Sequence, residues 1–156
     1  MISVRPATAA DADRLLDWAN DPVTRATGFY PATIDAATHA RWLEERLSSP
    51  SSRLYVGLED GRQVGMVRLD AEADGRVEVC ISVAPDSRGR GIGRALLEAG
   101  LAAGHADPDL DVAVFVARIR PENAASISLF AGAGFEAAGT DTVAGTPCLV
   151  YERVAG

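Results

Sequence analysis

The stretch VAPDSRGRGIGRALL, residues 83–97, constrains the fold of this chain more than any other. It follows an apolar alternating pattern typical of a strand and runs directly into an Ala/Leu-rich pattern typical of a helix. The free N–H groups at such a helix start point toward one spot, and glycines let a ligand approach them closely. The stretch therefore predicts an anion site at a strand-to-helix turn.

Two other phosphate-binding loops do not fit these glycines. A Walker loop needs GxxxxGK[ST], and no Lys-Ser or Lys-Thr pair follows here. A dinucleotide loop needs GxGxxG, but the third glycine position holds Arg94 when counted from Gly89 and Leu96 when counted from Gly91. The remaining ligand is a pyrophosphate bound by backbone N–H groups and flanking arginines without an obligatory metal. The alternative is a plain helix-start turn with solvated arginines.

Length, composition and net charge limit the kind of protein that this chain can be. A chain of 156 residues with 47% hydrophobic residues suits one domain, residues 1–156, with a real core. The net charge of -7 argues against non-specific binding to nucleic acid. Cys80 and Cys148 lie in no CxxC or Cys/His cluster, so we expect neither a disulfide framework nor a metal site. No signal-peptide core or membrane-spanning run is present, which predicts a cytoplasmic protein.

The order of the expected elements indicates a mixed α/β sheet in one domain. Thr8 and Asp11 form a capping-box pattern at the first helix, which runs through Trp18. Asp60-Gly61 marks the turn of a hairpin. We expect strands at 2–6, 53–59, 62–70, 76–85 and 110–119, helices at 8–19, 35–47, 92–104 and 121–134, an irregular segment at 20–31, and closing strands to 154.

A second motif, NAASISLF at 123–130, stands ahead of Gly134-Phe135. Together with the glycine loop it resembles the two signatures of the GNAT superfamily of acyl-CoA-dependent N-acetyltransferases. These are [RQ]xxGx[GA] after a strand ending in VxP, here Val83-Ala84-Pro85, and NxxSxx[LF][YF] before GF. The resemblance covers nearly the whole chain. It implies a mixed, mostly antiparallel sheet with splayed central strands and helices on both faces.

The resemblance also implies acetyl-CoA as cosubstrate, with no metal. The backbone N–H groups from Gly89 to Arg94 would hold the pyrophosphate, and the backbone of Ile81 and Val83 would pair with the pantetheine arm like an added strand. Asn123 would steer that arm, although it could instead be a plain helix cap, and Phe130 would lie beside the thioester. The implied acetyl-CoA site consists of Ile81, Val83, Arg88, Gly89, Arg90, Gly91, Ile92, Gly93, Arg94, Asn123, Ser126 and Phe130.

Glu78 is the candidate general base, because an ammonium acceptor must lose a proton before it attacks a thioester. Strand alternation puts it on one face with Cys80 and Ser82. The alternative is an ordinary solvent-facing or salt-bridged glutamate. Many relatives have tyrosine where this chain has Phe130, so the departing thiolate is protonated by another group, with Tyr30 a weak candidate, or leaves unaided. An acyl-cysteine route stays open, but buried cysteine is the commoner outcome.

The acceptor site is expected under the N-terminal helices, within residues 15–47. This segment resembles the branch of ribosomal-protein N-terminal and nucleotide-sugar amine acetyltransferases. The candidate acceptor-binding residues are Asn20, Arg25, Tyr30 and His39, with Trp42 beside them, although helical spacing also fits core packing. We expect a small-molecule amine, first an amino group on a nucleotide-linked sugar with Arg25 at the diphosphate, and second a protein N-terminus. The other possibilities are a non-catalytic acyl-CoA sensor and, for assembly, a monomer or a homodimer.

Overall fold

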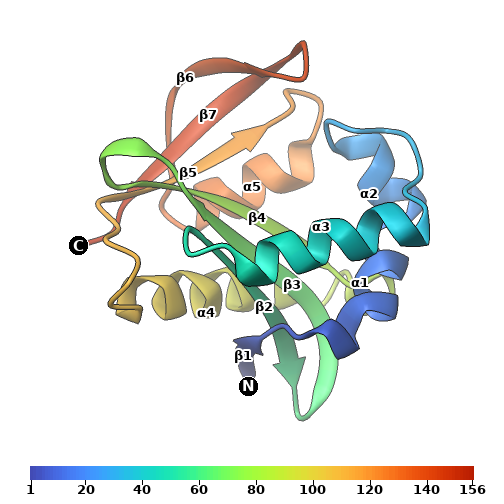
Figure 1. The fold of residues 1–156 in the computed structure, drawn as a ribbon. Coiled ribbons are helices and arrows are strands. Elements are labelled where there is room, and N and C mark those ends of the chain that lie inside the picture. The colour runs from blue at the N-terminus through green and yellow to red at the C-terminus, as the bar shows by residue number, and fades with distance from the viewer.

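A seven-stranded sheet with the strand order β1-β2-β3-β4-β5-β7-β6 forms the centre of the computed structural model, which describes residues 1–156 (Figure 1). Every neighbouring pair is antiparallel except β4 and β5, which are parallel. The expected mixed, mostly antiparallel sheet is therefore confirmed. The strands are β1 (Ile2–Pro6), β2 (Ser52–Glu59), β3 (Arg62–Ala71), β4 (Arg76–Val83), β5 (Val114–Ile119), β6 (Glu136–Val143) and β7 (Thr146–Val154).

Helices cover both faces of the sheet, because its strands alternate two sets of apolar side chains. On one face, Val67 and Leu69 pack in a cluster with Leu96 of α4 and Phe130 of α5. On the other, strand residues such as Val56 pack with side chains of α1 and α3. Figure 1 shows α3 in front of the central strands and α4 behind them. The helices are α1 (Ala12–Ala19), α2 (Pro22–Thr27), α3 (Ala36–Ser48), α4 (Ile92–Ala106) and α5 (Ala124–Gly132).

Local signals explain where most elements begin and turn. The Asp11 carboxylate accepts a hydrogen bond from Thr8 N at 2.8 Å, as the capping-box pattern predicted. Asp35 caps α3 by accepting from Thr38 N at 2.7 Å. The β2–β3 hairpin turns at Asp60 and Gly61, whose φ angles of 50° and 80° lie in the left-handed region that such tight turns require.

Two boundaries were predicted wrongly. The segment expected to be irregular contains α2. Helix α1 ends at Ala19, and Asp21 then caps a new helix by accepting from Thr24 N at 3.1 Å, with Pro22 at the first position. The strand expected from residue 110 begins at Val114. The residues before it form turns, in which Leu110 N donates to Asp107 O at 3.2 Å.

Strands β4 and β5 separate soon after they meet, as the resemblance implied. Their register covers only Arg76–Glu78 against Val114–Val116. On its other side β4 stays paired with β3 as far as Val83 opposite Gly65. The later part of β4 therefore has no strand partner toward β5, and we call the opening beyond Glu78 and Val116 the fork. No helix of the chain combines the length and the apolar composition needed to cross a membrane.

Candidate active site

A groove of about 650 Å³ runs from the glycine-arginine loop to the fork. Residues of α2, β4, β5 and α5 line it together with the loop. All of the residues expected to bind acetyl-CoA lie along this groove except Arg90. A second cavity of about 420 Å³ near the β2–β3 turn contains none of the predicted site residues.

The loop offers an open backbone at the start of α4. Gly89 and Gly91 have φ angles of 81° and 74°, and no atom lies within 4 Å of where a Cβ would stand on either residue. Gly91 is the N-cap, so the free N–H groups of the first helical turn follow it directly. A left-handed conformation and an unobstructed approach both favour glycine here. This geometry suits a phosphate held by backbone N–H groups and the helix dipole.

The three arginines of the loop are paired with carboxylates of the protein. Arg88 Nη2 lies 2.8 Å from Asp21 Oδ2, which ties the loop to α2. Arg90 Nη1 lies 3.3 Å from a carboxylate oxygen of β2, and Arg94 Nε lies 3.7 Å from Glu98 Oε1. The binding of a pyrophosphate by these arginines and by the loop backbone remains a prediction.

The α5 side of the groove contains Asn123, Ser126 and Phe130. Asn123 Oδ1 accepts from Ser126 N at 3.2 Å, so the plain helix cap considered as an alternative is present. Its Nδ2 donates to no protein atom and remains available to a ligand. Phe130 is only 3% exposed and meets Phe135 edge-on, with ring centroids 5.0 Å apart. The ring closes one wall of the groove and has no proton to give.

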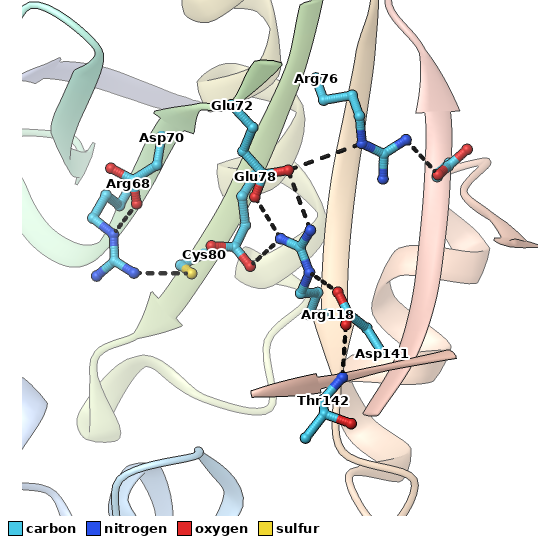
Figure 2. Close-up of polar contacts among 10 residues, drawn as sticks. Arg68, Asp70, Glu72, Arg76, Glu78, Cys80, Arg118, Asp141 and Thr142 are labelled. Carbon is cyan, nitrogen blue, oxygen red and sulfur yellow. Dashed lines mark hydrogen bonds and ion pairs between the residues drawn. The ribbon is translucent and has the colours of Figure 1, made fainter. Parts of the chain in front are cut away.

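A charged network occupies one side of the fork (Figure 2). Arg118 Nη1 donates to Glu78 Oε2 at 2.9 Å and to Glu72 Oε2 at 2.6 Å, and its Nε donates to Asp141 Oδ2 at 3.0 Å. These acceptors, Glu72 first, raise the pKa of Arg118 above its ordinary value, so the guanidinium stays charged. One cation thus faces three carboxylates. This side of the fork has an excess of negative charge.

Glu78 is the last residue of β4 that pairs with β5. Val79 beside it is 3% exposed in the core under α4, so the predicted alternation holds and Glu78 projects from the opposite face. Its Oε2 is bound by Arg118, as in the salt-bridged alternative, while Oε1 has no partner in the protein. Its role as a base remains a prediction.

Arg68 of β3 lies on the far side of β4 from the fork. Its Nε lies 2.8 Å from Asp70 Oδ2, and its Nη2 donates to Cys80 Sγ at 3.2 Å. Its guanidinium stands 5.5 Å from the Trp42 ring centroid, and Arg46 lies over the same ring at 5.9 Å. Arg46 also pairs with Asp70 at 2.9 Å, so two cations share one carboxylate. This side has an excess of positive charge.

Burial raises the pKa of both thiols above the ordinary value, most directly at Cys80, where it outweighs the nearby Arg68 cation. A neutral thiol is a poor nucleophile, which disfavours the acyl-cysteine route. Cys148 is 1% exposed and does not line the groove.

The four residues predicted to bind the acceptor do not line the groove. Asn20 exchanges two 2.8 Å hydrogen bonds with the backbone of Ile34, and Arg25 Nη1 donates to Tyr30 O at 2.7 Å. These contacts fold the α2–α3 connection onto itself. The Tyr30 side chain lies outside the groove, so it is not placed to protonate a thiolate there.

His39 is buried at 4% exposure, with its ring centroid 5.3 Å from that of Trp42. Burial lowers the pKa of His39 below its ordinary value, which keeps the ring neutral. These two side chains therefore pack against the core, which is the alternative that the helical spacing also allowed.

Sequence reasoning missed Arg68 and Arg118. Arg118 interrupts the otherwise apolar strand VFVARI, and a charged residue there could have drawn attention to it. Arg68 lies near Asp70 in a strand with further polar residues, which gives no such signal.

Known proteins similar to this chain share one chemistry. A family model for the acetyltransferase (GNAT) domain matches residues 2–136. The L-methionine sulfoximine/L-methionine sulfone acetyltransferase of Pseudomonas aeruginosa is 32% identical over 143 residues, which are 88% of this chain and 81% of that protein.

Two solved structures share the fold. Aminoglycoside acetyltransferase AAC(6')-Ib in complex with coenzyme A and kanamycin has a TM-score of 0.86 at 21% identity, over 99% of this chain and 95% of that one. RimL, a ribosomal L7/L12 alpha-N-protein acetyltransferase in complex with coenzyme A, has a TM-score of 0.82 at 14% identity, over 98% and 93%.

Proposed function

Because the chain belongs to the GNAT superfamily and is an acyl-CoA-dependent N-acetyltransferase, we propose that it acetylates the α-amino group of a small amino acid, with acetyl-CoA as the donor. Methionine sulfoximine and methionine sulfone are the first candidates, because the relative at 32% identity is named for them.

The separation of charge across β4, from the β3 side to the β5 side, carries this proposal. Arg68 and Arg46 around Asp70 leave positive charge on the β3 side. The carboxylates around Arg118 leave negative charge on the β5 side. An amino acid in water carries one ammonium and one carboxylate, so it complements both sides at once.

The chemistry follows from the position of Glu78 at the fork. The neutral amine attacks the thioester carbonyl, a C–N bond forms, and the C–S bond breaks with its electron pair leaving on the CoA sulfur. Glu78 Oε1, directly or through a water, accepts the proton that the nitrogen loses. The backbone N–H groups that β4 leaves unpaired beyond the fork are the donors available to the developing oxyanion.

The thiolate leaves without a tyrosine. Phe130 has no hydroxyl, and Tyr30 does not line the groove. A CoA thiolate is a tolerable leaving group, so the reaction proceeds by direct transfer in a ternary complex and needs no acid on α5.

A nucleotide-linked amino sugar takes second place as the acceptor. Its diphosphate would need a cation, and Arg25 is occupied by the carbonyl of Tyr30. The carboxylates around Arg118 would repel it as well. A protein N-terminus is the third candidate.

A CoA-release assay with a panel of amines tests the proposal. The panel contains methionine sulfoximine, methionine sulfone, common amino acids, kanamycin, UDP-linked 4-amino sugars and short peptides with free N-termini. We expect the highest kcat/KM for an amino acid. Faster turnover of the sugar nucleotides, the peptides or kanamycin overturns the acceptor class, and binding of acetyl-CoA without turnover of any amine identifies a sensor.

A further inference from the structure

We propose that Arg68 binds the carboxylate of the acceptor and thereby determines its specificity for amino acids over other amines. This inference rests on the proposed function, since it assigns the part of the site that recognises the acceptor's acidic group.

Arg68 lies on β3, across β4 from the fork, and reaches the groove through its neighbour on β4. It is opposite Cys80 in the β3–β4 register, and Cys80 lines the groove. The 3.2 Å contact from Arg68 Nη2 to Cys80 Sγ brings the guanidinium to the groove wall. Figure 2 shows Cys80 between Arg68 on one side and Glu78 with Arg118 on the other.

The guanidinium is held before any ligand arrives. Its Nε is fixed by Asp70 at 2.8 Å, and its plane lies near the Trp42 ring, with 5.5 Å between the guanidinium carbon and the ring centroid. A pre-oriented arginine loses little side-chain freedom when it binds a carboxylate, which favours recognition by the planar fork of N–H groups.

Arg68 has more free donor capacity than Arg118. Nη1 of Arg68 donates to no protein atom and is not among the buried polar atoms without a partner, so it is open to a ligand. Every nitrogen of Arg118 already donates to a carboxylate, on Glu72, Glu78 or Asp141. Those three carboxylates also repel a further anion, so Arg68 is the better placed of the two arginines to bind one.

The position of Arg68 also orients the acceptor. Arg68 pairs with Cys80 and Asp70 pairs with Glu78, so Arg68 and Glu78 are diagonal neighbours on one face, with Cα atoms about 7–8 Å apart in such a sheet. A carboxylate held at Arg68 directs the amino group on the same Cα toward the free Oε1 of Glu78 and the fork. In this arrangement Arg68 binds the carboxylate while Glu78 accepts the proton of the amino group.

The experiment compares methionine sulfone with its carboxamide, which keeps the amine and loses the acidic charge. We expect the wild-type protein to have a KM for the acid about 10- to 100-fold below that for the amide. Arg68→Gln should abolish this ratio by raising the KM for the acid alone, with kcat within about threefold. Arg68→Lys, which keeps the charge but not the planar fork, should restore part of it.

Arg53→Gln is the matched control. Arg53 is also a strand arginine whose Nε pairs with an aspartate, at 2.7 Å from Asp107, and its side chain is 21% exposed against 22% for Arg68. Arg53→Gln should leave the ratio of the KM for the acid to the KM for the amide unchanged. The inference is wrong if the wild-type protein has the same KM for methionine sulfone and for its carboxamide, or if Arg68→Gln raises both KM values equally. If the protein acetylates neither compound but does acetylate another kind of amine, the proposed function is overturned instead.

Discussion

Arg118 Nη1 donates to Glu78 Oε2 over 2.9 Å at the point where β4 and β5 part. The bond fixes one carboxylate oxygen and leaves the other free. Arg118 also binds Asp141 of β6, so the position of Glu78 is tied to the β6–β7 hairpin as well as to its own strand.

Replacing Glu78 with glutamine should lower kcat/KM about 10²- to 10⁴-fold, because an amide cannot take up the proton of the attacking amine. The amide oxygen can still accept from Arg118, so the fold should be unaffected. Glu152→Gln is the control, since Glu152 is also a strand carboxylate in an ion pair, at 2.9 Å from Arg76, but it does not contact Arg118. A loss below about threefold for Glu78→Gln, with an unchanged pH profile, would remove Glu78 from the mechanism.

Gly91→Glu should weaken acetyl-CoA binding by about two orders of magnitude or more, because it adds bulk and a like charge where the pyrophosphate is expected. Isothermal titration calorimetry measures this directly. Gly61→Glu is matched in backbone strain, with a φ angle of 80° against 74° at Gly91, and has equally open surroundings. Unchanged affinity in a folded Gly91→Glu protein places the pyrophosphate elsewhere.

The Arg5–Asp11 ion pair should increase the free energy of unfolding near neutral pH, and this contribution should be lost at acidic pH. Hydrogen bonds from Arg5 chiefly, with one from Thr8 N, lower the pKa of Asp11 below its ordinary value, and the side chain is buried at 5% exposure. A lowered folded-state pKa means that the contribution is complete above about pH 4 and is lost as pH falls through the folded-state value.

Asp11→Asn should therefore lower the free energy of unfolding at pH 7 by about 1–3 kcal/mol, measured by urea denaturation. The difference from wild type should shrink as pH falls below about 4. A difference that stays constant down to pH 2 would show that the ion pair is not its source.

Elements with strong local signals could be predicted from the sequence. The glycine loop, the Asp60-Gly61 turn and the capped helix after Asp35 each depend on backbone preferences of neighbouring residues. Helix α2 was not predicted, because its six residues are too few to show a helical period. In addition, an Asp-Pro pair can mark the start of a helix as well as its end.

The acceptor side could not be predicted, because it depends on which side chains meet across strands. Alternation places Arg68 and Arg118 on a face but does not say that one lies near Trp42 and the other gathers three carboxylates. The spacing of His39 and Trp42 fits a binding site and a packed core equally well, but in the structure His39 is buried and Trp42 packs, partly buried, against the core.

The separation of β4 from β5 gives the protein an exposed strand edge inside its sheet rather than at the border. Edges of this kind are open to hydrogen exchange and to unwanted strand pairing. On our prediction that the pantetheine arm pairs with the backbone of Ile81 and Val83, the cosubstrate supplies the missing hydrogen bonds. Folding would then be coupled to donor supply: at a hundred times its Kd, acetyl-CoA adds about 2.7 kcal/mol to the free energy of unfolding. The concentration of acetyl-CoA relative to its Kd would thus govern how long the enzyme survives proteolysis as well as how fast it works.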